Sequence, residues 1–131
     1  MPFWRLYYHL VRTTRNREAI IGSTLENRLY PYLVEKASSL GCQVDAINGI
    51  EDHIHMVLSI PPKYSIAEIV QKLKGASSHD FEELAWQRGY GVFSFGEKQR
   101  AYAVAYVMNQ KDHHPQKTIN SWLERCDDEE G

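Results

Sequence analysis

Two histidines separated by one residue, His53 and His55, form the pattern in this sequence that most clearly indicates a chemical role. Apolar and other residues alternate over residues 53–60, which predicts a strand with one wholly apolar face. Side chains at positions i and i+2 of a strand project from the same face, so the two imidazoles lie close together. Such a pair can coordinate one divalent ion and leave positions for oxygen ligands or substrate. Taken alone, the spacing also fits two histidines that line a polar sheet face.

A tyrosine and a glutamine, Tyr106 and Gln110, form the second pattern, because residues four apart stack on one face of a helix. A tyrosine can attack phosphorus, but its ordinary pKa of about 10 keeps it protonated near neutrality. A metal ion that polarises a phosphate oxygen makes the phosphorus more reactive, and a glutamine oxygen can bind the same ion. Taken alone, the pair also fits a half-buried tyrosine that anchors the helix and an exposed amide.

The two patterns together resemble one family. The segment 52–56 is similar to the His–hydrophobic–His signature of the HUH endonucleases. The segment 105–110 resembles the tyrosine helix of the small TnpA-type, single-tyrosine transposases of insertion sequences, the IS200-like transposases. Further segments that resemble this family are 8–17, 72–78 and 89–94, and the resemblance covers about residues 4–114.

The resemblance implies a role for each residue of the two patterns. His53 and His55 bind a divalent ion, Mg²⁺ or Mn²⁺, and Gln110 is the third protein ligand. Tyr106 attacks a phosphodiester of single-stranded DNA, which gives a 5′-phosphotyrosine link and a free 3′-hydroxyl. A hydroxyl of another strand can then reverse the reaction. One phosphoester replaces another at each step, so no nucleotide cofactor is expected.

The resemblance also implies partners. Members of the family act as homodimers, in which the tyrosine helix of one subunit can complete the metal site of the other, and they recognise DNA hairpins near transposon ends. Gly96, just ahead of the tyrosine helix, is compatible with a mobile joint. Basic residues near the resembling segments are candidates for contacts with the DNA backbone, although each also fits a solvated charged surface. These candidates are Arg12, Arg15, Arg17, Lys72 and Lys74.

Two further residues have aromatic rings that could belong to the site. Tyr102 lies one turn before Tyr106, and we interpret it as a packing or substrate-stacking residue. His9, on the first predicted strand, is interpreted as structural.

The elements that must position these residues follow the order β-α-β-β-α-β-α. Their predicted ranges are strand 3–13, helix 25–40, strand 42–50, strand 53–60, helix 66–87, strand 90–95 and helix 97–111. Capping boxes are predicted at residues 23–26 and 65–68, and a bend or bulge at Asn48 and Gly49. The first six elements match an α+β, ferredoxin-like (RRM-like) sandwich, to which a C-terminal helix carrying the tyrosine is added.

Composition limits the class of protein further. A chain of 131 residues is expected to form one domain, since domains run to roughly 100–150 residues. The sequence shows no apolar run near the ~20 residues of a membrane span, no signal-peptide pattern and only two cysteines. We therefore expect a cytoplasmic protein with no membrane association.

The net charge of −2 is unevenly distributed. The tail at about residues 124–131, which we expect to be flexible, contains four consecutive acidic residues at 127–130. Without these four, 15 basic residues face 13 acidic ones. The remaining chain is mildly basic, which permits a phosphate-bearing partner.

Two other functions fit parts of the sequence. A non-catalytic or domesticated module of the same fold could bind single-stranded nucleic acid through aromatics such as Tyr90 and Phe93. A metal-dependent hydrolase of small phosphoesters could use the two histidines. However, Val57 stands where a histidine-triad enzyme would have another histidine. The sequence also lacks a Gly-x-x-x-x-Gly-Lys loop for nucleoside triphosphates.

Overall fold

The structure, a computed structural model, describes residues 3–111. Residues 112–131 of the predicted domain, which include the acidic tail at 124–131, lie outside the described residues. The strands are β1 (Tyr7–Thr13), β2 (Gln43–Ile50), β3 (His53–Ser59) and β4 (Gly91–Phe95). The helices are α1 (Ser23–Ser39), α2 (Ile66–Asp80) and α3 (Arg100–Met108), with short 3-10 turns at Arg15–Arg17 and Glu97–Gln99.

The strands form one antiparallel sheet in the order β2-β3-β1-β4. Strands β1 and β3 are therefore the two inner strands, and their register pairs Thr13 with His53 and Val11 with His55. The element order and the antiparallel sheet confirm the predicted ferredoxin-like fold with an added C-terminal helix.

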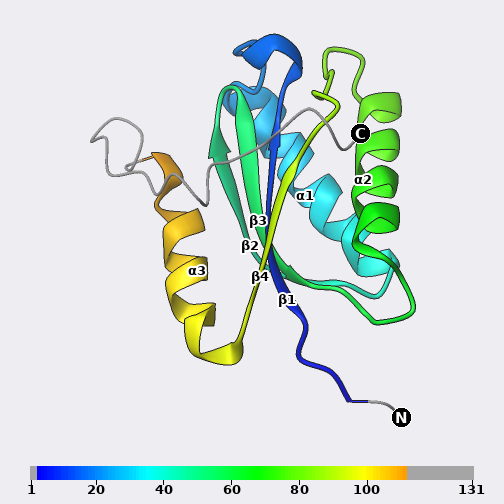
Figure 1. The fold of residues 1–131 in the computed structure, drawn as a ribbon. Coiled ribbons are helices and arrows are strands. Elements are labelled where there is room, and N and C mark those ends of the chain that lie inside the picture. The colour runs from blue at the N-terminus through cyan, green and yellow to red at the C-terminus, as the bar shows by residue number, and fades with distance from the viewer. Residues whose placement is uncertain (1–2, 112–131) are drawn as a thin grey trace.

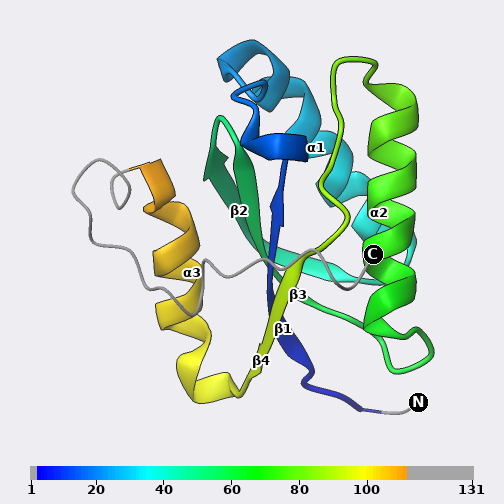
Figure 2. The ribbon, with the colours of Figure 1, turned by 45° about the horizontal axis from the view of Figure 1, so that its top comes forward.

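Helices cover both faces of the sheet, with α1 and α2 on one side and α3 on the other (Figures 1 and 2). The period-two pattern of β3 divides its side chains between these layers. Ile54, Met56 and Leu58 enter the large core shared with α1 and α2, whereas Val57 packs against α3. None of the helices within residues 3–111 is long and apolar enough to cross a membrane.

Helix α2 ends at Asp80, and its predicted extension to residue 87 is wrong. Phe81 already has an extended backbone, and Trp86 forms an isolated antiparallel bridge with Thr14. The indole Nε1 of Trp86 donates a hydrogen bond of 2.8 Å to the Ser77 hydroxyl. Trp86 is therefore buried as part of an extended segment that runs back along the end of β1, because this long-range pairing outweighs local helix propensity.

Several predicted termini also differ from the structure. The capping box at residues 65–68 is present, but α1 is capped by Gly22 without a side-chain hydrogen bond, and Ser23 is the first helical residue. Strand β1 begins at Tyr7 rather than residue 3, and the predicted helix 97–111 opens with the 3-10 turn. The bulge in β2 falls between Val44 and Ala46, not at Asn48 and Gly49.

Candidate active site

The two histidines of β3 lie beneath helix α3 in the interior of the protein. His53 and His55 are 2% and 0% exposed, and their ring centroids are 5.0 Å apart. The next residue on the same face, Val57, packs against the apolar side of α3. The pair therefore does not line an exposed polar sheet face, because α3 covers it.

Each histidine ring meets a polar partner at its Nδ1 atom. The Nδ1 of His53 lies 2.7 Å from Oδ1 of Asp52, the turn residue before β3. The Nδ1 of His55 lies 2.7 Å from Nε2 of His9 on the neighbouring strand β1. When a histidine donates its Nδ1–H to an acceptor, the lone pair resides on Nε2, which is how outer-shell groups orient ligand histidines in metal sites.

Gln110 brings an oxygen to the same place. Its side chain is buried, and its Oε1 lies 3.4 Å from Nε2 of His53. Two imidazoles and a carboxamide oxygen suit a divalent ion that accepts both nitrogen and oxygen ligands, such as Mn²⁺, and they leave coordination positions for oxygens of a substrate. The donor set therefore fits a divalent ion.

Tyr106 lies against this histidine cluster. The residue is 4% exposed, and its ring centroid lies 6.0 Å from that of His9 and 6.1 Å from that of His55. Tyr102, one turn earlier, is 58% exposed, and its centroid lies 6.3 Å from that of Tyr106. Tyr106 is therefore in the interior beside the histidines, and Tyr102 is at the surface beside Tyr106.

Polar contacts at both ends of α3 attach this helix to β2. At its start, Arg100 makes two hydrogen bonds of 3.0 Å to the carboxylate of Asp45, which lies at the bulge in β2. These bonds raise the pKa of the Arg100 guanidinium above its ordinary value, so Arg100 stays charged. At its end, Asn48 donates to the Met108 carbonyl at 2.9 Å, and the Lys111 ammonium donates to the Gly49 carbonyl at 2.9 Å. The orientation of Tyr106 is thus fixed by contacts at both ends of its helix.

Gly49 allows β2 to approach β3 at His53. A Cβ atom at this position would lie 2.1 Å from the His53 carbonyl oxygen and 2.9 Å from the Ile54 Cα. We expect Gly49→Ala to separate the strands and to lower the free energy of unfolding by about 1–3 kcal/mol, the usual cost of overpacking. Urea denaturation measures this change.

Gly75→Ala is the matched control for that substitution. Gly75 lies within α2, and no heavy atom stands within 4 Å of a Cβ built there. An alanine at this position should raise the free energy of unfolding by up to about 1 kcal/mol, because glycine is a weak helix former. Equal stability of Gly49→Ala and the wild-type protein would contradict the close approach.

The basic candidates occupy different environments. Arg15 and Lys74 line a cleft beside α2. Arg88 lines it with them, although no pattern in the sequence indicates a role for Arg88. Arg17 lies 3.7 Å from the carboxylate of Asp52, the residue that contacts His53. Lys72 is exposed on α2 and does not line the cleft.

Arg12 is buried, with 4% of its surface exposed. Its Nη2 donates to the backbone carbonyls of Gln87 at 2.7 Å and Arg88 at 3.3 Å, and its guanidinium lies over the Tyr90 ring. Arg12 therefore supports the segment that carries Arg88, and the contact of Arg12 with the DNA backbone stays a prediction.

Solved structures of transposases share this fold. A crystal structure of a Deinococcus radiodurans R1 protein assigned as a transposase superposes with a TM-score of 0.67 at 26% identity, over 83% of this chain and 93% of that one. A REP-associated tyrosine transposase bound to a REP hairpin gives a TM-score of 0.68 at 15% identity, over 87% of this chain and 74% of that one. The fold is thus one that solved structures of transposases also have.

The chain belongs to the IS200-like transposase family, whose family model matches residues 2–110. It is 27% identical over 121 residues to the ISDra2 transposase TnpA of Deinococcus radiodurans, and the alignment covers 83% of this chain and 86% of that protein. It is 31% identical over 125 residues to the transposase of insertion sequence IS200 of Salmonella typhimurium, over 82% and 78% respectively. Membership of this family implies cleavage and transfer of DNA.

Proposed function

We propose that this protein is a metal-dependent transposase that cleaves and rejoins single-stranded DNA through a 5′-phosphotyrosine at Tyr106. The observation that supports the proposal most directly is the position of the Tyr106 ring, which lies against the buried histidine cluster. Gln110 lies one turn further along and next to His53. A module that only binds nucleic acid has no need for this combination.

The ion would be held by His53, His55 and Gln110. When bound, Mg²⁺ or Mn²⁺ would polarise a non-bridging oxygen of the scissile phosphate and stabilise the charge that develops there. Asp52 and His9 orient the two histidine rings from the other side. Burial beneath α3 limits access of water to the ligand atoms.

Tyr106 supplies the nucleophile. Its phenol loses a proton, its oxygen forms a bond to phosphorus, and the bond from phosphorus to the 3′-oxygen breaks. The departing 3′-oxygen takes up a proton, and the 5′-phosphate stays linked to the tyrosine. Attack by the 3′-hydroxyl of another strand reverses these steps and releases Tyr106, so the total number of phosphoester bonds is conserved.

The DNA partner would be a strand with a hairpin near an element end, and the protein would act as a homodimer. The related REP-associated transposase is bound to a hairpin, which supports the first part. Family resemblance supports the second. Within one chain, α3 packs on its own β2 and β3, so each chain brings Tyr106 to its own histidines.

The test uses labelled single-stranded DNA that carries candidate hairpin ends, incubated with Mg²⁺ or Mn²⁺ and, separately, with a chelator. A denaturing gel should show a covalent protein–DNA adduct in the presence of the metal and none with the chelator. Cleavage of the DNA without an adduct would favour the hydrolase. Binding of the DNA without cleavage, with every candidate end, would favour the non-catalytic module.

His9 should increase the affinity of the site for the metal ion without binding the ion itself. Its Nε2 meets Nδ1 of His55, so His9→Phe removes this partner and should weaken Mn²⁺ binding about 10–100-fold, the usual effect of losing an outer-shell partner. Calorimetric titration with Mn²⁺ measures the change. His9→Gln should recover part of the affinity, because its carboxamide oxygen can accept the same hydrogen bond.

The control for His9 is His79→Phe, since His79 is exposed on α2. It should bind Mn²⁺ as the wild-type protein does. An affinity of His9→Phe equal to that of the wild-type protein would contradict the positioning role.

A further inference from the structure

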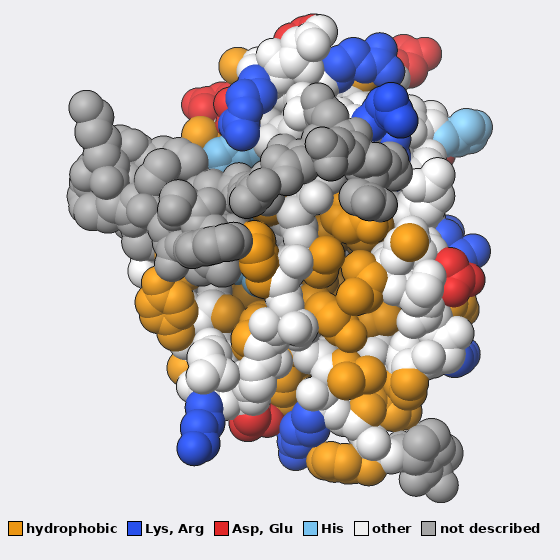
Figure 3. Space-filling view, viewed as in Figure 1, with side chains coloured by type: hydrophobic (Ala, Val, Ile, Leu, Met, Phe, Trp, Pro, Cys, Tyr) orange, Lys and Arg blue, Asp and Glu red, His pale blue; other side chains and the backbone are white. Residues whose placement is uncertain are grey.

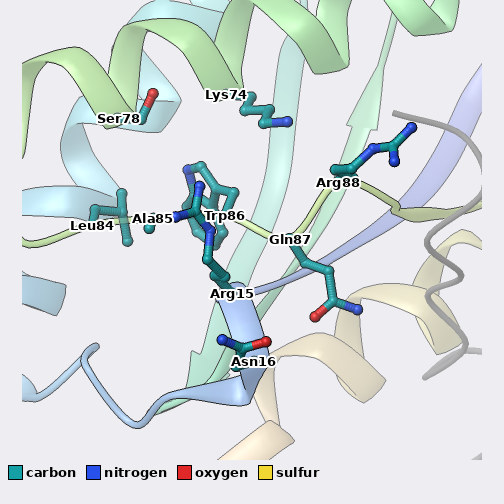
Figure 4. A pocket seen from close by; sticks show the side chains of 9 residues that line it. All are labelled: Arg15, Asn16, Lys74, Ser78, Leu84, Ala85, Trp86, Gln87 and Arg88. Carbon is teal, nitrogen blue, oxygen red and sulfur yellow. The ribbon is translucent and has the colours of Figure 1, made fainter.

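A basic cleft lies at one end of the molecule, between α2, the turn after β1 and the extended segment before β4. Its volume is about 450 Å³. Among residues 3–111, three cationic side chains line it together with polar and apolar residues, and no acidic residue of this range does (Figure 4). The cations are Arg15, Lys74 and Arg88, and the polar residues are Asn16, Ser78 and Gln87. Lys and Arg side chains lie at the same end in Figure 3, where the turn after β1 lies in Figure 1, and some Asp or Glu side chains stand at the edge of this end.

The backbone around the cleft is tied together by hydrogen bonds. The Arg15 amide donates to the Ala85 carbonyl at 2.8 Å, and the Gln87 amide donates to the Thr13 carbonyl at 2.9 Å. The Arg12 guanidinium donates hydrogen bonds to the Gln87 and Arg88 carbonyl oxygens. The backbone positions that carry the three cations are therefore set by the fold.

The cations repel one another. Burial lowers the pKa of Lys74, and the positive charges of Arg12, Arg88 and Arg15 lower it further. Within residues 3–111, no carboxylate forms an ion pair with Arg15, Lys74 or Arg88. Holding these like charges together costs free energy, which an anion bound among them would offset.

The cleft and the candidate active site lie on opposite faces of the same end of the sheet. Trp86, which lines the cleft, belongs to the core shared with α1 and α2, whereas Tyr106 lies on the face covered by α3. Thr13 connects the cleft with the candidate active site. It pairs with His53 in the sheet register, and its carbonyl oxygen accepts a hydrogen bond from the Gln87 amide. A strand of DNA held in the cleft can therefore continue around the end of β1 towards Tyr106.

We propose that this basic cleft binds backbone phosphates of the DNA that flanks the cleavage point, as a subsite separate from the reacting phosphate. The proposal rests on the function proposed above and adds where the flanking strand lies. The guanidinium groups of Arg15 and Arg88 and the ammonium of Lys74 pair with phosphate oxygens, and the amides of Asn16 and Gln87 can donate to them. Because phosphates carry no sequence information, the cleft contributes affinity rather than sequence preference.

The test measures DNA affinity in the absence of chemistry. Tyr106→Phe protein is titrated, without divalent metal, into a fluorescein-labelled strand containing a hairpin and into a poly-thymidine strand of equal length, at several salt concentrations. Adding Arg88→Gln or Arg15→Gln should weaken binding to both strands several-fold. Each should also reduce the slope of log affinity against log salt by about one, as expected for one lost phosphate contact.

Lys63→Gln is the control, because Lys63 is an exposed lysine in the loop before α2 and does not line the cleft. It should leave affinity and slope close to those of the parent protein. Affinities of the Arg88 and Arg15 variants equal to the parent, or an equal loss in Lys63→Gln, would overturn the proposal. A wild-type protein that forms no adduct would instead count against the proposed function, since this binding assay involves no cleavage.

Discussion

Tyr106→Phe is expected to abolish the covalent protein–DNA adduct and to leave binding of the same DNA intact. The substitution removes one hydroxyl and keeps the ring, which packs in the interior against His9 and His55. The fold should therefore persist, while the atom that forms the bond to phosphorus is lost. A denaturing gel measures the adduct, and fluorescence anisotropy without divalent metal measures binding.

Tyr102→Phe is the matched control for this variant. Tyr102 carries the same group on the same helix, one turn earlier, and is largely exposed. It should form the adduct as the wild-type protein does. Persistence of the adduct in Tyr106→Phe, together with its loss in Tyr102→Phe, would identify Tyr102 as the nucleophile.

His53→Asn is expected to produce the second large effect. The asparagine amide can replace the Nδ1–H group that faces Asp52, but it is too short to replace Nε2, which faces Gln110. Mn²⁺ affinity should fall by more than about 100-fold, beyond the 10–100-fold typical of outer-shell changes. Calorimetric titration measures this affinity, and the metal-dependent adduct should disappear.

Asp52→Asn separates the role of a ligand from that of its support. It keeps His53 and weakens only the group that orients it, so its loss of Mn²⁺ affinity should be smaller than that of His53→Asn. Circular dichroism checks that both variants fold. Wild-type Mn²⁺ affinity in folded His53→Asn would show that His53 is not a ligand.

Local patterns predicted the element order and the side of the strand on which the histidines lie. The period of two along β3 placed His53 and His55 opposite Ile54 and Met56, and the structure agrees. The capping box at Ser65 is likewise a local signal, because both of its partners lie within four residues. The assigned roles of Tyr106 and Gln110 are predictions that the experiments above address.

Long-range pairing decided what the sequence could not predict. His9 meets His55 because β1 and β3 are neighbours in a particular register, which no local pattern encodes. Arg12 is buried for a similar reason, since the extended segment containing Gln87 folds over it. That segment was predicted as helix, so the position of Arg88 at the cleft could not be foreseen.

The residues of the candidate site come from the beginning, middle and end of the described chain. His9 lies on β1, the histidine pair on β3, and Tyr106 and Gln110 on the last helix and just beyond it. During translation, Tyr106 and Gln110 therefore leave the ribosome after the four strands of the sheet described above. Hydrogen bonds attach both ends of α3 to β2, so docking of this helix would bring Tyr106 against the histidines in one late folding event. A nascent chain that stops short of this helix lacks both Tyr106 and Gln110, so under the proposed mechanism DNA cleavage must await synthesis of residue 110.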